Sequence, residues 1–262
     1  MSAEWKPAAE SLATDLRAVF RDRFLSLVAY GPQLEGDATA PLTCLALVTS
    51  LTVDDLHACA KHAPRWARAH VATPLILPEH EFRRSLDAFP LEYGEIIRAH
   101  ARVVGNNPFD GIAIAREDLR RACETQIKSH LVHLREGYIE SGGSPGAVAE
   151  LVAASAPAFT ALLRNVARLN GVTTSDRTDA TRQGARGAGL PEHVVDDVAA
   201  LEQKPGHAGV DAARLFPDYL AAIEQLARAV DAWHPLDSPR AESRGSLGAN
   251  LSDSLRSLGA AD

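Results

Sequence analysis

The stretch that decides the fold reads YGPQLEGD over residues 30–37 and TCLAL over residues 43–47. An apolar run, Leu25 to Tyr30, precedes it and ends at Gly31, which is typical of a buried strand that runs into a turn. A second apolar run, Leu42 to Leu51, follows the turn, and its inner part, Cys44 to Thr49, is the expected strand. The sequence therefore predicts two neighbouring strands joined by a turn-rich loop.

Helices and strands alternate on both sides of this stretch. An amphipathic helix is predicted over Glu10 to Phe24, where apolar residues recur every three or four positions, and another over Val53 to Ala69. Beyond these helices we expect, in order, a strand, a short helix and a further strand: Thr73 to Leu77, Glu79 to Leu86 and Leu91 to Ile97. This alternation predicts an α/β domain with a mixed sheet and flanking helices.

Every strand signal disappears after Asn106-Asn107-Pro108, and the rest of the chain reads as an all-helical bundle. The expected helices are Arg116–Glu140, Ala147–Leu169, Asp176–Arg186, Pro191–Leu201 and Asp211–Trp233. Pro157 predicts a kink or a fresh helix start inside the second of them. From His234 onward no period persists, which predicts disorder. We therefore expect an α/β domain over 1–107, a helical domain over 108–234 and a disordered tail over 235–262.

The Tyr30-Gly31 turn, the Gly36-Asp37 pair and the strand that follows resemble the signature of the DNA polymerase β-like nucleotidyltransferase superfamily. In that family a strand runs into Gly-Ser, and after a short helix and a loop the next strand carries Asp-x-Asp. The resemblance covers roughly residues 10–105, and the helical continuation is similar to that of bacterial small nucleotidyltransferases. It implies a nucleotidyltransferase-like α/β domain followed by a helix bundle.

The resemblance also implies what each position does in an active member of the family. The two carboxylates of Asp-x-Asp and a third from a neighbouring strand hold two Mg²⁺ ions, which clamp the nucleotide phosphates and activate the attacking hydroxyl. Backbone N–H groups and the hydroxyl of the Gly-Ser turn bind those phosphates. In this sequence Gly31, Pro32 and Gly36 are then the nucleotide-binding positions.

Most of the residues that carry the chemistry are replaced. Pro32 stands in place of the serine and has neither an N–H nor a hydroxyl. Cys44 and Ala46 stand at the two aspartate positions and offer Mg²⁺ no oxygen ligand. Glu92 falls near the third carboxylate, and Asp37 is a weaker catalytic candidate, because Asp in a turn commonly caps its own backbone. We expect a degenerate site without a metal, with Mg²⁺ and a nucleoside triphosphate as cofactors only if the site is active.

Two further motifs are weaker. Gly184, Gly187 and Gly189 faintly resemble a dinucleotide-binding loop, but they do not follow a predicted strand. His130 and His133 are three residues apart on one predicted helix, and no spacing in the sequence indicates a third or fourth metal ligand. Neither motif predicts a cofactor.

The composition argues against several classes of protein. The net charge is −7 and the isoelectric point is about 5.8, which disfavours a nucleic-acid partner. Three widely separated cysteines favour a reducing compartment. The N-terminus lacks a secretory pattern, and no stretch approaches the ~20 apolar residues that span a bilayer. We expect a cytoplasmic, bacterial-type protein without a membrane partner.

Three functional interpretations follow. The first is a pseudoenzyme kept as a nucleotide-sensing or protein-interaction module. The second is an active, Mg²⁺-dependent nucleotidyltransferase that uses substitute carboxylates to modify a small molecule or a protein. The third is a helical interaction protein of a toxin–antitoxin-like pair. A nucleotide, a protein partner and a second copy of the chain all remain open as partners. Carboxylates that converge near Cys44 and Ala46 favour the enzyme, whereas a hydrophobic or closed cleft favours the module.

Overall fold

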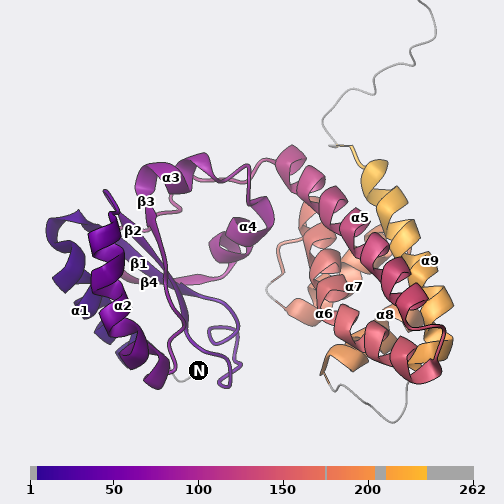
Figure 1. Ribbon diagram of the computed structural model, residues 1–262. Coiled ribbons are helices and arrows are strands. Elements are labelled where there is room, and N and C mark those ends of the chain that lie inside the picture. Colours follow the sequence, from indigo (N-terminus) through magenta and orange to yellow (C-terminus); the bar gives the residue numbers. More distant parts are fainter. Residues whose placement is uncertain (1–4, 175, 204–210, 235–262) are drawn as a thin grey trace, which may run out of the picture. The chain divides into compact units, whose positions relative to one another are not determined.

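The computed structural model describes residues 5–174, 176–203 and 211–234. The first part of the chain forms a four-stranded sheet in the order β3-β2-β1-β4 (Figure 1). The strands are β1 (Phe24–Tyr30), β2 (Thr43–Val48), β3 (Leu75–Pro78) and β4 (His100–Gly105). β1 pairs antiparallel with β2 and β4, and β2 pairs parallel with β3, so the sheet is mixed, as the sequence predicts.

One face of the sheet is covered by α1 (Lys6–Phe20) and α2 (Val53–Arg68), as Figure 1 shows. The buried face of α1 follows helical spacing and presents Ala9, Leu12, Leu16 and Phe20 to the core. α2 is fixed to α1 by Trp66, whose Nε1 donates a hydrogen bond of 2.9 Å to Oδ2 of the buried Asp15. Arg65 of α2 also forms an ion pair with Asp15. This hydrophobic core and the polar contacts of Asp15 fix the sheet and the two helices as a single layered unit.

The opposite face of the sheet carries a second, smaller core. Val28 on β1 and Leu45 and Leu47 on β2 are almost fully buried there. They are covered by side chains from α3 (Glu79–Arg84), from α4 (Pro90–Arg98) and from the loop after β4: Phe82, Tyr93, Ile96 and Phe109. The aromatic rings of this group meet edge to face, with centroids 5.1 Å apart for Phe82 and Tyr93. The centre of this face is therefore closed by apolar side chains.

The predicted strand over Leu91 to Ile97 is wrong, because this segment is the helix α4. Pro90 occupies the first turn of the helix, where its fixed backbone angle and missing N–H are tolerated. The fourth strand, β4, comes directly after this helix and lies along β1. The error arose because a short apolar segment with alternating polar residues fits both a strand and a helix.

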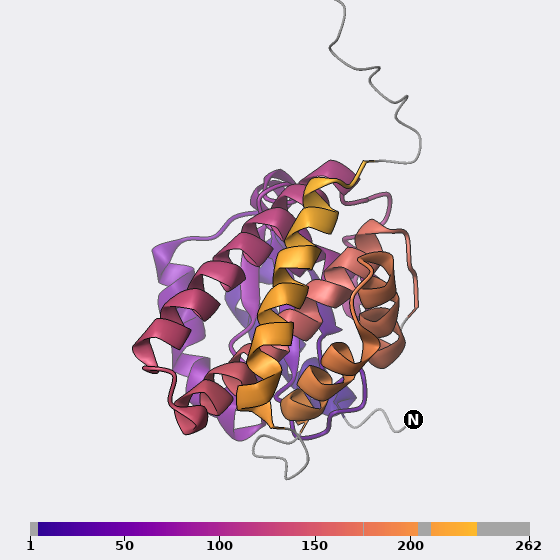
Figure 2. The ribbon, with the colours of Figure 1, turned by 90° about the vertical axis from the view of Figure 1, so that its right-hand side faces the viewer.

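The remaining described elements are all helices: α5 (Arg116–Glu140), α6 (Pro145–Leu169), α7 (Arg177–Gly187), α8 (Glu192–Gln203) and α9 (Ala212–Asp231). Figure 2 shows α9 running beside α5 at the front of this bundle. α6 contacts α5, α7, α8 and α9, so it is the central helix of the bundle, and it continues through Pro157. The sequence-based expectation of a sheet followed by a helical bundle is confirmed.

α6 is long and apolar enough to cross a membrane by length and composition alone. The core helix of a soluble protein passes the same test, and α6 has fully buried positions at helical spacing, namely Val152, Ala156, Phe159 and Leu163. This helix therefore gives no independent information about location, and a cytoplasmic location stays a prediction.

Internal contacts group residues 1–231 into one compact unit. Within it, the described strands all end by Gly105 and only helices follow from Arg116, which is the change of secondary structure that the sequence predicts. The division into separate domains over 1–107 and 108–234 stays a prediction. The predicted disordered tail, 235–262, lies outside the described residues.

A partly buried polar network lies between the helices of the bundle, centred on the fully buried Tyr219. Nε2 of His130 lies 2.9 Å from the hydroxyl of Tyr219, and that hydroxyl lies 3.0 Å from Oγ of Ser155. Burial lowers the pKa of His130 to about 4, and the neighbouring His133 adds to the effect. The imidazole of His130 is therefore neutral at pH 7 and serves as a hydrogen-bonding partner of Tyr219.

This network predicts that the bundle loses stability in mild acid. Between pH 6.5 and about 4 the unfolded chain protonates His130 while the folded chain does not, so the free energy of unfolding falls as the pH falls through that window. Above pH 6.5 the group contributes no pH dependence. We expect a loss on the order of 2 kcal/mol across the window. Denaturant titrations at pH 7.5, 6 and 5 measure it.

The matched variants for this experiment are His130→Gln and His133→Gln. The first removes the titrating group from the core and should flatten the pH dependence, while the second changes an exposed imidazole on the same helix and should keep it. An unchanged pH dependence in His130→Gln would show that other groups cause the loss.

Candidate ligand-binding site

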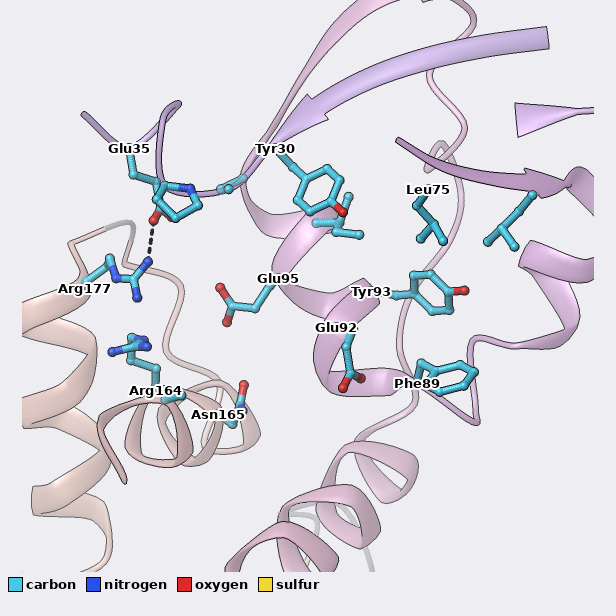
Figure 3. A pocket seen from close by; sticks show the side chains of 16 residues that line it. Tyr30, Glu35, Leu75, Phe89, Glu92, Tyr93, Glu95, Arg164, Asn165 and Arg177 are labelled. Atoms are coloured by element: carbon cyan, nitrogen blue, oxygen red, sulfur yellow. Dashed lines mark hydrogen bonds and ion pairs between the residues drawn. The ribbon is translucent and has the colours of Figure 1, made fainter. Parts of the chain in front are cut away.

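A cavity of about 610 Å³ lies where the ends of β1 and β3 meet α4, α6 and α7 (Figure 3). Its volume is within the range of small-molecule sites. The wall combines residues that are far apart in the chain: Tyr30, Gly31, Pro32, Glu35, Leu75, Leu77, Phe89, Glu92, Tyr93, Glu95, Ile96, Ala99, Ala161, Arg164, Asn165 and Arg177. This cavity is the candidate site of the protein.

One end of the cavity is apolar. Leu75, Phe89 and Tyr93 gather there in Figure 3, with Leu77 and Ile96 continuing the wall. Leu75 is 39% exposed and Phe89 is 52% exposed, so two large hydrophobic side chains face solvent at this end. The rings of Phe89 and Tyr93 meet edge to face with centroids 6.2 Å apart. Apolar surface that is left in contact with water inside a concavity is suited to cover the apolar part of a ligand.

The other end is charged. Glu35, from the loop after β1, accepts hydrogen bonds from Arg98 of α4 at 2.5 Å and from Arg177 of α7 at 2.9 Å. Burial acts to raise the pKa of Glu35, but the hydrogen bonds from the two guanidinium groups outweigh it, and the pKa lies below its ordinary value. Glu35 is therefore a carboxylate at neutral pH, and it ties the loop to both halves of the chain.

A second set of ion pairs joins α4 to α6. Nη1 of Arg168 donates to Glu95 at 3.0 Å and to Oδ1 of Asn165 at 3.1 Å. The guanidinium group lies over Gly94, where a Cβ atom would come within 1.5 Å of Nη2. Arg98 also pairs with Glu95 at 3.2 Å, so Glu95 and Glu35 share one arginine. The charged end of the cavity is thus a connected network.

The loop that begins at Gly31 offers few groups to a phosphate. Gly31 has φ +87°, and a Cβ atom there would approach Oγ1 of Thr43 to 2.6 Å, so the turn requires glycine. The N–H groups that follow are bonded within the loop itself. Those of Leu34 and Gly36 donate to the carbonyl oxygens of Gly31 and Gln33, and those of Glu35 and Asp37 both donate to the carbonyl oxygen of Pro32. Gly31 and Pro32 line the cavity, whereas a Cβ atom on Gly36 would meet nothing within 4 Å. The turn keeps its shape, but those four donors are already used.

Cys44 and Ala46 lie on the face of β2 that is opposite to the cavity. Both are buried in the core beneath α1 and α2, and burial raises the pKa of the Cys44 thiol to about 12. Successive side chains on a strand point to opposite faces, so the cavity side of β2 instead carries Thr43, Leu45 and Leu47. Cys44 and Ala46, the degenerate metal positions expected from the sequence, therefore lie on the face of the sheet away from the cavity.

Glu92 and Asp37 occupy separate surroundings. Glu92 is exposed on α4 and lines the cavity, but it is on a helix and not on a strand beside β2. Asp37 accepts hydrogen bonds from the N–H and hydroxyl of Thr39 at 2.9 and 2.6 Å and lines a neighbouring hollow of about 400 Å³. Over residues 5–174, 176–203 and 211–234, no group of three or more His, Cys, Asp or Glu side chains is placed to hold a metal ion.

Sequence reasoning missed the residues that the helical half contributes. Arg164 and Asn165 on α6 and Arg177 at the start of α7 line the cavity, and none was predicted. One signal was present: Arg164, Asn165 and Arg168 interrupt the otherwise apolar second half of the helix over Ala147–Leu169. Polar residues on a buried helix need partners, so such an interruption indicates a site or an ion pair.

Comparison with known proteins finds a similarity of structure. No protein-family model matches the chain. No curated protein matches it. Among solved structures, it is similar to a spectinomycin adenyltransferase from Enterococcus faecialis, determined with ATP and spectinomycin, at a TM-score of 0.52 and 12% identity over 86% of this chain and 98% of that one. At this identity the likeness concerns the fold, which is nucleotidyltransferase-like. Membership of the DNA polymerase β-like superfamily stays a prediction.

Proposed function

We propose that this chain is a nucleotidyltransferase-like pseudoenzyme that binds a small ligand in its cavity and does not transfer nucleotidyl groups. The observation that carries the proposal is the composition of the sheet face toward the cavity. Val28, Leu45 and Leu47 form its centre, and Phe82 of α3 and Tyr93 of α4 cover them. If the resemblance to the nucleotidyltransferase superfamily places metal ions on this face of the sheet, the apolar and covered centre of that face argues against metal binding in this chain.

The chemistry of nucleotidyl transfer depends on oxygen ligands at that place. Negative charge gathers on the phosphoryl oxygens in the transition state, and two metal ions held by carboxylates neutralise it. The cavity-side positions of β2 offer Thr43 and Leu45, and Leu45 is 1% exposed. The hydroxyl of Thr43 donates to the carbonyl oxygen of Tyr30, and Leu45 is a buried apolar side chain. Neither replaces an anionic metal ligand.

Substitute carboxylates are the basis of the alternative, an active enzyme. Three glutamates line the cavity: Glu35, Glu92 and Glu95. Glu35 and Glu95 are engaged by arginines, and each would have to give up those ion pairs before binding a cation. Glu92 alone binds hydrated Mg²⁺ weakly. The third interpretation, an interaction protein of a toxin–antitoxin-like pair, gains no specific observation.

The test is a transfer assay with labelled ATP, GTP, CTP and UTP in the presence of Mg²⁺. We expect the natural protein to give no more product than Glu92→Ala or Asp37→Ala, because neither carboxylate belongs to a two-metal site. A spectinomycin adenyltransferase with spectinomycin serves as the positive control for the assay. Robust transfer by the natural protein that either substitution abolishes would show an enzyme with substitute ligands.

A further inference from the structure

Charges are balanced in and beside the cavity. Among the described residues that line it and the small hollow next to it, four guanidinium groups meet four carboxyl groups. These are Arg98, Arg164, Arg168 and Arg177, and Glu35, Glu92, Glu95 and Asp176. An ion that enters such a site leaves water without meeting an excess of opposite charge. The cavity therefore favours a ligand without net charge.

Large apolar side chains of the cavity wall are left in contact with water. Leu75 and Phe89 are 39% and 52% exposed, and Leu77 extends the same wall. Covering such surface releases water and is favourable. Phe89 and Tyr93 are aromatic, and aromatic rings pack well against a further ring. A ligand that fits this end has a flat apolar body.

One uncharged polar group of the wall has a donor to spare. Asn165 of α6 lines the cavity and is only 6% exposed, and its Oδ1 accepts a hydrogen bond of 3.1 Å from Nη1 of Arg168. That bond sets the orientation of the amide, so Nδ2 is the atom left for another partner. Within the described part of the chain no group accepts a hydrogen bond from Nδ2.

Nδ2 of Asn165 is also not sealed inside the protein. Among the described residues, the one fully buried side-chain nitrogen or oxygen without a partner is Oε1 of Gln33, so Nδ2 keeps accessible surface. Figure 3 shows Asn165 on the α6 side of the cavity, with Leu75 and Phe89 on the other side. A buried donor that opens into a cavity is matched by an acceptor on the ligand, because leaving the donor unpaired is costly.

We propose that the cavity binds an uncharged, flat apolar molecule with a carbonyl group, its oxygen at Nδ2 of Asn165 and its body along Leu75 and Phe89. This inference rests on the proposed function, because it assumes a cavity that binds without transferring. A nucleoside triphosphate carries several negative charges and meets a loop whose N–H groups from Leu34 to Asp37 are already bonded. The rivals are an organic anion held by the arginines and an organic cation held by the carboxylates.

The experiment is equilibrium dialysis of the full-length chain against four naphthyl compounds of nearly equal shape, and against ATP with Mg²⁺. The compounds are acetylnaphthalene, isopropenylnaphthalene, naphthoate and naphthamidine, all substituted at the same ring carbon. The first is an uncharged ketone, the second replaces its oxygen by CH₂, and the last two are an anion and a cation. Their comparison separates the effect of the acceptor from the effect of charge.

We expect the ketone to bind most tightly, with one site per chain. It should exceed isopropenylnaphthalene by about fivefold, because only the ketone accepts a hydrogen bond. Naphthoate and naphthamidine should each bind at least about tenfold more weakly than the ketone, because each carries a charge out of water without an excess of opposite charge. ATP with Mg²⁺ should also bind more weakly than the ketone.

Asn165→Asp tests the position of the acceptor. It keeps the size of the side chain and an oxygen for Arg168, but a carboxylate has no N–H to donate. The ketone should then lose its advantage over isopropenylnaphthalene, and naphthamidine should bind more tightly than it does to the natural protein. Asn106→Asp, at an exposed asparagine after β4 and outside the cavity wall, is the matched control and should change neither.

Phe89→Ser tests the position of the apolar body. It should weaken all four naphthyl compounds alike, by about fivefold, because each places the same rings on this wall. Its control is Ile139→Ser, at a 77% exposed side chain of α5, which should bind the ketone as the natural protein does. Thermal unfolding checks that every variant is folded.

Several outcomes would overturn the inference: no binding of the ketone, equal or tighter binding of naphthoate, naphthamidine or ATP, or an Asn165→Asp effect no larger than that of Asn106→Asp. Failure of the proposed function looks different, because it requires product in the transfer assay. A charged compound that binds tightly without any transfer would sink the uncharged ligand and leave the binding function standing. Transfer of a labelled nucleotide would sink both.

Discussion

Gly184→Ala should lower the free energy of unfolding by at least about 3 kcal/mol. Gly184 is where α7 lies against α6, and a Cβ atom there would be 1.9 Å from the carbonyl oxygen of Leu163 and 3.2 Å from the backbone N of Ala167. Both neighbours are backbone atoms inside a helix, so no side-chain rotation relieves the overlap, and the two helices must separate. Denaturant unfolding of the variant and the natural protein measures the loss.

Gly146→Ala is the matched control for this substitution. Gly146 lies in the first turn of α6 and a Cβ atom there would meet nothing within 4 Å, so alanine should be neutral or stabilise the helix by up to about 1 kcal/mol. If Gly184→Ala costs less than about 1 kcal/mol, α6 and α7 are not in the close contact described here.

Ala46→Asp is expected to be the second severe substitution, at about 4 kcal/mol or more. Ala46 is 0% exposed in the core under α1 and α2, and the buried side chains of that core are apolar, so a carboxylate there would be poorly solvated. Burial would raise the pKa of the new carboxyl, so the loss should be present in full at pH 7 and shrink as the pH falls toward 4. Unfolding at pH 7 and pH 4.5 tests both the size and the sign.

Thr43→Asp is the control, because Thr43 lies on the same strand but on its cavity side. The substitution removes the hydrogen bond from the threonine hydroxyl to the carbonyl of Tyr30 and should cost about 1 kcal/mol. Equal losses for Ala46→Asp and Thr43→Asp would contradict the assignment of faces on β2. The same pair tests where restored aspartates would belong, because positions 43 and 45, not 44 and 46, lie on the side of the sheet that carries the cavity, although neither lines it.

The order of elements could be predicted from the sequence, except for α4 and β4, because most element boundaries have a local cause. The helix predicted over Arg116–Glu140 has the same bounds in the structure, since glycines and a proline follow it directly. The sequence did not indicate which side chains of β2 point to which face of the sheet. A slip of one residue exchanges every inward and outward side chain of a strand, and the apolar run LTCLALVTSL over residues 42–51 is buried on both faces, so it contains no alternation from which to choose.

The cavity was the least predictable part, because its charged end is made by tertiary contacts. Nothing in the sequence distinguishes Glu35 from the rest of the turn-rich loop over residues 30–37, yet Glu35 meets Arg98 and Arg177 in the structure. Helix α4 had been predicted as a strand, so neither Glu95 nor Arg98 could be placed on a common surface with α6. Single-sequence periodicity reports which side of an element is buried, but not which element covers it.

The ion pair between Glu35 and Arg177 joins residues 142 positions apart in the chain. During synthesis Glu35 leaves the ribosome long before its partner, by roughly 10 to 30 s at ordinary elongation rates. In the later part of that interval both the loop after β1 and α4 exist, while α7 has not yet been made. A nascent chain released before residue 177 should therefore fold its sheet and expose an unfinished cavity, with Phe89 and Leu75 open to chaperones.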